Sequence, residues 1–169
     1  MLIFLCGMPG SGKTTVGREL ARLQNSNLID LDEYIAKKEK LAIPQIFKTK
    51  GEDYFRKAES TCLKELIEKN HNTVVSVGGG TPCFNQNMKI MTDGGKTIYL
   101  KATPETLSKH IEEGKNPRPL FAKLNGDRLY DKVASMLSHR EKHYLKATAT
   151  IDIENKTPAE IAKEITTLI

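Results

Sequence analysis

Gly7-Met8-Pro9-Gly10-Ser11-Gly12-Lys13-Thr14 is the stretch that decides the fold of this chain. It matches the pattern G-x-x-x-x-G-K-[ST] at every fixed position. Residues 2–6 before it are wholly apolar, as in a buried parallel strand, and residues 14–23 after it repeat apolar side chains with a helical period. A strand, a glycine-rich turn and a helix in this order predict a phosphate-binding loop, and a plain strand-to-helix turn is the weaker interpretation.

The residue types of this loop suit the phosphates of a nucleotide. Its glycines let successive backbone N–H groups converge on phosphate oxygens, and the helix that follows directs the positive end of its dipole at the same anion. Lys13 can reach the β and γ phosphates, and the Thr14 hydroxyl can ligate Mg²⁺. We therefore predict that the protein binds a nucleoside triphosphate.

The composition is typical of one soluble domain. The chain has 169 residues, 38% of them hydrophobic and 28% charged, and its net charge of +5 is scattered rather than gathered in a basic block. Anionic small molecules explain this charge better than nucleic acid does. There is no long apolar run and no basic leader, so neither a membrane span nor a signal peptide is expected. Three widely spaced cysteines favour the reducing cytoplasm, and a monomer is expected.

Strand and helix patterns alternate along the chain. The candidate strands are 2–6, 28–31, 73–77, 96–101 and 148–153. Helical patterns lie between them, at 14–23, 32–40, 51–69, 84–91, 104–113, 126–146 and 158–168. This alternation predicts an α/β fold in three layers, with a parallel sheet covered by helices on both faces.

Asp30 and Asp32 follow the second candidate strand, two residues apart. If the strand geometry persists, both carboxylates point to the same face beside the phosphate loop. One would then hold Mg²⁺ through water while the other accepts a proton from an attacking hydroxyl. The alternative, in which Asp32 only caps the next helix, is equally compatible with the spacing.

Two helical patterns carry charged residues on otherwise apolar faces. In 51–69, Glu59 lies within an apolar stripe and Arg56 at its edge, and in 126–146 Arg140 lies at the centre of another. A buried charge needs a partner, and two inward arginines suggest a pocket for a carboxylate. The alternative for Arg56 is a simple i, i+3 pair with Glu59.

Two loops complete the candidate site. Gly78, Gly79 and Gly80 end the third candidate strand, where the backbone can approach a ligand closely, and no acidic residue stands there to hold Mg²⁺, so Asp30 is expected to do so. The segment of about 112–126 is rich in glycine and proline and is predicted to be a mobile lid. Its Arg118 can close over the transferring phosphoryl group, or it is an exposed arginine of no consequence.

This set of motifs, in this order and spacing, resembles the shikimate kinases over nearly the whole chain. The resemblance implies a single kinase domain over 1–169, a five-stranded parallel sheet in the order 2-3-1-4-5, and a shikimate-binding region at about 32–60. It also implies ATP-dependent phosphorylation of the 3-hydroxyl of shikimate, a step of aromatic amino-acid biosynthesis.

The resemblance further implies a role for each matching residue. The ATP phosphates would be held by Gly10, Ser11, Gly12, Lys13, Thr14, Thr15 and the lid residue Arg118, with Lys156 bordering the nucleotide. Mg²⁺ would be held by Thr14 directly and by Asp30 through water. Shikimate would be held by Asp32, Arg56, Gly78, Gly79, Gly80 and Arg140, and the catalytic residues would be Lys13, Asp32 and Arg118.

One position departs from the family pattern, and two rival functions stay open. Ile111 stands where many members have an arginine against adenine, which puts the adenine contacts in doubt. A related kinase of gluconate, of another hydroxy acid or of a nucleotide is one rival. A nucleotide-dependent switch is the other, although Asn155-Lys156-Thr157-Pro158 lacks the aspartate of the guanine-reading N-K-x-D motif. ADP release that depends on shikimate would separate the three.

Overall fold

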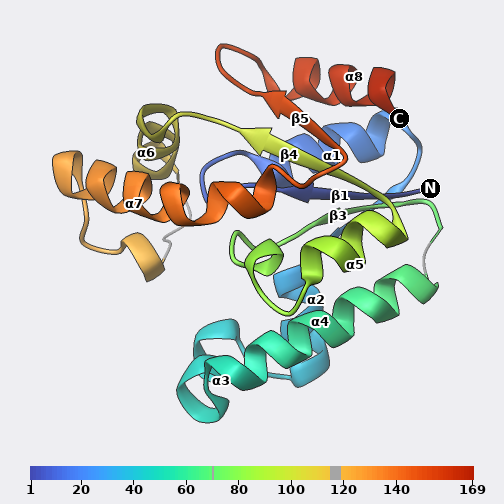
Figure 1. The fold of residues 1–169 in the computed structure, drawn as a ribbon, viewed down its shortest axis with the longest axis horizontal. Helices are drawn as coiled ribbons and strands as arrows, with labels where there is room; N and C mark the ends of the chain where they lie inside the picture. The colour runs from blue at the N-terminus through green and yellow to red at the C-terminus, as the bar shows by residue number, and fades with distance from the viewer. Residues whose placement is uncertain (70, 115–118) are drawn as a thin grey trace.

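The computed structural model describes residues 1–69, 71–114 and 119–169, which form a three-layer α/β fold (Figure 1). Five parallel strands make one sheet in the order β2-β3-β1-β4-β5. The strands are β1 Leu2–Cys6, β2 Asn27–Asp30, β3 Thr73–Ser76, β4 Lys96–Lys101 and β5 Ala149–Asp152. The predicted fold class and strand order are confirmed.

Helices fill the connections between the strands, and one more helix follows the last strand. They are α1 Lys13–Leu23, α2 Leu31–Glu39, α3 Ile43–Lys50, α4 Glu52–Lys69, α5 Asn87–Gly94, α6 Pro104–Glu113, α7 Gly126–Tyr144 and α8 Pro158–Leu168, with 3₁₀ turns η1 Thr81–Cys83 and η2 Pro119–Phe121. The start predicted at residue 84 for α5 is wrong, because Phe84 is extended and both Asn85 and Gln86 have positive φ.

Helix α3 was not predicted from the sequence. It has only eight residues and carries Pro44 in its first turn. A proline is tolerated there because the first N–H groups of a helix have no partner within the helix. Ile43, Ile46 and Phe47 give α3 an apolar face, but two turns are too short for this period to stand out.

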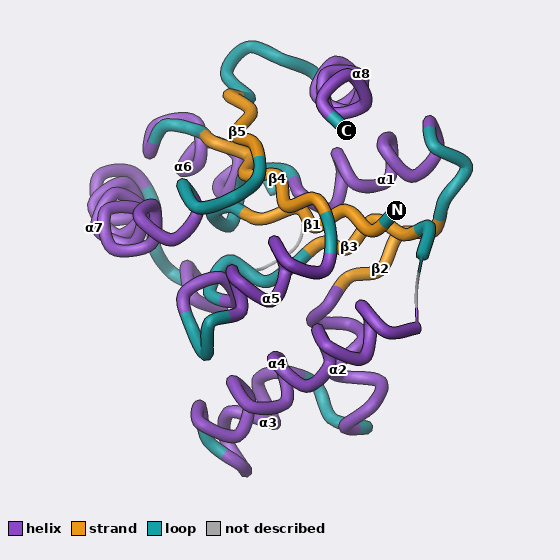
Figure 2. Tube along the Cα trace, turned by 45° about the vertical axis from the view of Figure 1, so that its right-hand side comes forward, coloured by secondary structure: helices purple, strands orange, loops and turns teal. Residues whose placement is uncertain are grey.

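The sheet runs through the middle of the molecule (Figure 2). Helices α1 and α8 pack against each other on one face, and α5 lies against β4 on the other. Helices α2, α3 and α4 pack together beyond the edge formed by β2. All five residues of β1 are buried, which explains why this strand is an unbroken apolar run.

The carboxyl ends of three adjacent strands bring the predicted motifs together. The phosphate loop follows β1, the three glycines follow β3, and the two aspartates lie at the end of β2 and the start of α2. This edge is where open parallel sheets bind their ligands.

Among the described residues, no helix is both long and apolar enough to cross a membrane.

Candidate active site

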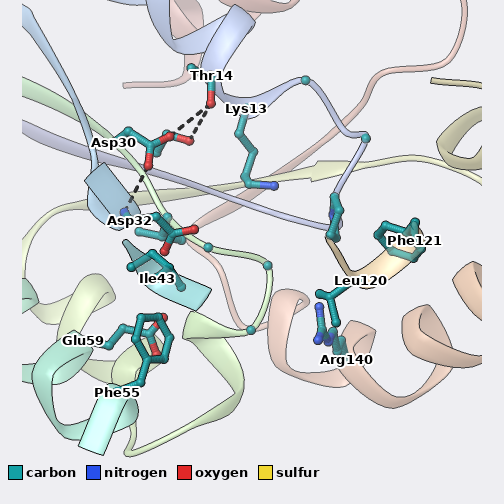
Figure 3. A pocket seen from close by; sticks show the side chains of 18 of the residues that line it. Lys13, Thr14, Asp30, Asp32, Ile43, Phe55, Glu59, Leu120, Phe121 and Arg140 are labelled. Carbon is teal, nitrogen blue, oxygen red and sulfur yellow. Dashed lines mark hydrogen bonds between the residues drawn. The ribbon is translucent and has the colours of Figure 1, made fainter. Parts of the chain in front are cut away.

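The phosphate loop has the backbone conformation and the donor groups that suit an anion. Gly10 and Gly12 have φ values of +91° and +78°, which favour glycine. The Lys13 ammonium donates hydrogen bonds to the carbonyls of Gly7 and Met8 at 3.0 and 2.9 Å, and Figure 3 shows its side chain reaching into the pocket. The buried Ser11 hydroxyl has no hydrogen-bond partner among the described residues. The loop thus offers donors of the kind that phosphate oxygens bind.

Three oxygen-bearing side chains meet at the start of α1. The Thr14 hydroxyl donates to Asp30 Oδ2 at 3.3 Å and lies 3.4 Å from the Ser76 hydroxyl (Figure 3). Hydroxyl and carboxylate oxygens are the ligands that Mg²⁺ prefers, usually with several waters retained. This cluster therefore fits a metal held by Thr14, with Asp30 and Ser76 behind it. Ser76 was not predicted, because a single serine in a buried strand carries no signal in the sequence.

The two aspartates do not share a strand face as predicted. The chain turns into α2 at Leu31, and Asp30 is the residue before the helix, where its Oδ1 accepts hydrogen bonds from the N–H groups of Asp32 and Glu33 at 3.0 and 3.3 Å. The alternative that Asp32 caps this helix is also wrong, since Asp30 does so. Asp32 thereby lies in the first turn of α2, and its carboxylate points into the pocket (Figure 3).

The Asp32 carboxyl is the strongly perturbed acid of the pocket. Burial raises its pKa to about 6, and the nearby Asp30 and Glu59 carboxylates add to the rise. It packs against the glycine loop, because a Cβ placed on Gly78 would lie 3.1 Å from Asp32 Oδ1. A carboxylate with a pKa just below neutrality is ionised at pH 7 and is still basic enough to accept a proton.

Arg56 is surrounded by two carboxylates and an aromatic ring. Its guanidinium pairs with Glu59 at 3.1 Å and Glu52 at 3.2 Å, and its centre lies 4.0 Å from the centroid of the Phe84 ring. The i, i+3 pair with Glu59 therefore exists, as the alternative interpretation had it. The guanidinium also lies 3.0 Å from the position of a Cβ on Gly80, so it faces the glycine loop and lines the pocket as well.

Glu59 is the buried partner that fixes this arginine. It is 1% exposed, and it accepts a hydrogen bond from the Thr81 hydroxyl at 2.5 Å in addition to the pair with Arg56. Burial raises the pKa of Glu59, while the Thr81 hydroxyl and the arginine oppose that rise. Glu59 thus holds Arg56 against the glycine loop. The helical phase of α4 predicted that Glu59 would be buried, but not its contact with Thr81.

Arg140 differs from Arg56 in its charge environment. No carboxylate of the described residues forms an ion pair with it. It is half-buried, and its guanidinium lies 3.2 Å from the position of a Cβ on Gly79. Figure 3 shows it in the wall of the pocket across from Asp32. An anionic ligand is the partner that such an arginine lacks.

One pocket of about 410 Å³ contains these groups (Figure 3). Of the predicted residues it is lined by Gly10, Gly12, Lys13, Thr14, Thr15, Asp30, Asp32, Arg56, Gly78, Gly79, Gly80 and Arg140. Its apolar wall is formed by Ile43, Phe47, Phe55, Leu120 and Phe121, which lie within the predicted shikimate-binding region and lid but were not predicted individually to line the pocket. Two of these residues belong to the unpredicted α3, and two belong to η2, a turn within the segment that was expected to be the lid.

Two predicted residues are not part of the pocket lining, and a third lies outside the described residues. Ser11 is buried within the phosphate loop and does not line the pocket. Lys156 lies in the turn after β5, where its ammonium pairs with Glu164 at 2.7 Å. Arg118 lies outside the described residues. The lid arginine and the nucleotide contact of Lys156 therefore stay predictions.

The phosphate loop lies at the end of the central strand, and a carboxylate and two arginines lie in the pocket beside it. This arrangement defines a phosphate-loop kinase that acts on a small molecule. The shikimate kinase family model matches residues 9–169, and the chain belongs to this family. A shikimate kinase of Parabacteroides distasonis is 43% identical over 152 residues, which are 90% of this chain and 87% of that protein.

Solved structures agree with this assignment. The crystal structure of the shikimate kinase of Bacteroides thetaiotaomicron superposes with a TM-score of 0.92 at 34% identity and covers 99% of this chain and 97% of its own. The Acinetobacter baumannii shikimate kinase in complex with shikimate gives a TM-score of 0.86 at 33% identity, over 99% of this chain and 91% of that one. The resemblance read from the motifs is confirmed.

Proposed function

We propose that this protein transfers the γ-phosphoryl group of ATP to the 3-hydroxyl of shikimate, giving shikimate 3-phosphate and ADP. The observation that carries the proposal is the pocket itself, in which the carboxylate of Asp32 and the guanidinium of Arg140 lie across from each other beside the phosphate loop. A hydroxylated carboxylic acid has the two groups that this arrangement recognises. Family membership and a relative of 33% identity solved with shikimate support the same acceptor.

The acceptor is held by its carboxylate and by the glycine loop. Arg140 has no acidic partner in the described structure and supplies the principal charge. Arg56 assists from the opposite helix, with its position fixed by Glu59. A planar guanidinium grips a carboxylate through two parallel hydrogen bonds, so the bound acid is oriented as well as attracted. The close backbone of Gly79 completes the pocket between the arginine and the phosphate loop.

The donor is held by the phosphate loop and its lysine. Lys13, Ser11 and the backbone of residues 10–15 would bind the phosphates, and Thr14, which contacts Asp30 and Ser76, would ligate Mg²⁺. Bound Mg²⁺ supplies charge neutralisation at the β and γ phosphates. Asp32 accepts the proton of the 3-hydroxyl while that oxygen bonds to the γ phosphorus and the bond to the ADP oxygen breaks. Arg118 closes over the transferring group, and Lys156 borders the nucleotide.

The cellular setting follows from this reaction. Shikimate phosphorylation belongs to aromatic amino-acid biosynthesis, and we propose that the protein works there as a cytoplasmic monomer. Gluconate or another hydroxy acid is the rival acceptor. The relatives with 33% identity or more described above are all shikimate kinases, which favours shikimate over that rival.

A coupled assay of ADP release tests the acceptor. We expect ADP release with ATP, Mg²⁺ and shikimate together, and none above background when shikimate is omitted. Gluconate and nucleoside monophosphates serve as controls and should not replace shikimate. Release that follows gluconate rather than shikimate would overturn the assignment.

The metal assignment predicts a specific defect for Asp30→Asn. Asparagine caps helices about as well as aspartate, so α2 should be kept while the negative charge beside Thr14 is removed. We expect the Mg²⁺ concentration for half-maximal activity to rise by about tenfold, because a charged ligand support is lost, with little change in melting temperature. Asp93→Asn, an exposed carboxylate on α5, is the matched control. Equal Mg²⁺ requirements in both variants would rule out the metal role of Asp30.

A further inference from the structure

The last residue of α7, Tyr144, is buried at the junction of the donor and acceptor sites without lining the pocket. It is 0% exposed. Its hydroxyl donates a hydrogen bond to the carbonyl of Gly79 at 2.5 Å and lies 3.7 Å from the sulfur of Met8 in the phosphate loop. One phenol group therefore contacts both the glycine loop and the loop that binds the nucleotide.

The same hydroxyl lies beside the guanidinium of Arg140, one helical turn earlier on α7. Burial raises the pKa of Tyr144, and Arg140 opposes that rise through its charge and through a side-chain hydrogen bond. Gly79 has no free space around it, because a Cβ there would lie 2.9 Å from Pro9 Cδ and 3.2 Å from an Arg140 nitrogen. Arg140, Gly79 and the phosphate loop thus meet around a single hydroxyl.

The ring of Tyr144 is itself held in place. It packs against the ring of Tyr99 with a centroid distance of 5.1 Å. The Tyr99 hydroxyl donates to Glu141 at 3.3 Å, on the same helix as Arg140. A phenylalanine would fill the space of either ring, so packing alone does not explain the Tyr144 hydroxyl. What the hydroxyl adds is its bond to Gly79 and its contact with Arg140.

We propose that Tyr144 is a positioning residue for the acceptor, whose buried hydroxyl holds the Gly79 carbonyl and the Arg140 guanidinium in the geometry that binds the shikimate carboxylate. This inference rests on the proposed function. Loss of the hydroxyl removes a hydrogen bond from the Gly79 carbonyl and an interaction from the Arg140 guanidinium, so both groups can move toward other partners or water. A displacement of this kind weakens binding of the acceptor far more than binding of the nucleotide.

Tyr144→Phe and Tyr99→Phe form a matched pair for the test. Both remove one buried phenolic hydroxyl from the same stacked pair, and only the Tyr144 hydroxyl contacts the site. We expect Tyr144→Phe to raise the KM for shikimate by about tenfold, the loss of one buried hydrogen bond, with the KM for ATP changed less than about twofold. Tyr99→Phe should leave both KM values near those of the wild type.

Thermal shift with shikimate alone gives a second measurement that needs no turnover. The wild type and Tyr99→Phe should be stabilised at the same shikimate concentration, and Tyr144→Phe should need about tenfold more for the same shift. Equal responses of all three proteins would overturn the inference and leave the proposed function intact. A wild type that does not respond to shikimate, and does not release ADP with it, would instead overturn the proposed function.

Discussion

Asp32→Asn is expected to lower kcat by about 10²- to 10⁴-fold, the range for removal of a general base. The amide fills the space of the carboxyl beside Gly78 and cannot accept the proton of the 3-hydroxyl. Shikimate affinity should change much less, because Arg140 and Arg56 still bind the carboxylate of the substrate. Rapid-mix measurement of single-turnover phosphoryl transfer, with steady-state kcat beside it, provides the check.

Glu33→Gln is the control for this variant. Glu33 is the next carboxylate in the first turn of α2, and it is exposed. Its neutralisation removes the same charge from the same turn without touching the pocket, so kcat should stay within about twofold of the wild type, as for most exposed surface changes. A kcat for Asp32→Asn that matches that of Glu33→Gln would show that Asp32 is not the base.

The raised pKa of Asp32 gives the pH profile a defined sign. Only the ionised carboxylate accepts a proton, so activity should rise with pH as the group ionises near its pKa of about 6, and should level off above it. In Asp32→Asn this acidic limb should disappear from the residual activity. Persistence of the limb in the variant would assign the titration to another group.

The parts of this fold that sequence reasoning predicted are those with a local period. Buried strands read as apolar runs, and long helices show a regular stripe, so the order of elements and the burial of Glu59 on α4 followed from spacing. The two-turn α3 and the turn at Leu31 were not predicted, for two different reasons. The first was too short to show a period, and the second broke a strand period that was assumed to continue.

Other parts of the candidate site could not be predicted because they depend on contacts between distant residues. Thr81 bonds to Glu59 across 22 positions, Ser76 meets Thr14 across 62, and Tyr144 reaches Gly79 across 65. No period or motif encodes such pairs, because each is set by how whole elements pack. The candidate catalytic and binding residues could be predicted from motifs, but the residues that hold them in position could not.

The two arginines of the pocket should respond differently to truncation. Arg56 neutralises the buried Glu59, so Arg56→Ala leaves a buried acid without its partner and should lower the melting temperature as well as shikimate binding. Arg140 has no carboxylate partner in the described structure, so Arg140→Ala should lower the melting temperature less than Arg56→Ala does. This difference in melting temperature distinguishes an arginine that stabilises the fold from one that serves to bind the ligand.

Arg140→Ala should raise the KM for shikimate by about 10- to 150-fold, which corresponds to loss of about 1.5–3 kcal/mol from hydrogen bonds to a charged group. Arg140→Lys should recover only part of this, because an ammonium keeps the charge and loses the paired geometry. Lys132→Ala removes an exposed cation from the same helix and is the control for net charge. The KM for ATP should stay within about twofold of the wild-type value in all three variants, because only binding of the acceptor is weakened. If Arg140→Ala and Lys132→Ala gave the same shikimate KM, the carboxylate of the acceptor would have to lie elsewhere, and Arg56 would be its remaining partner.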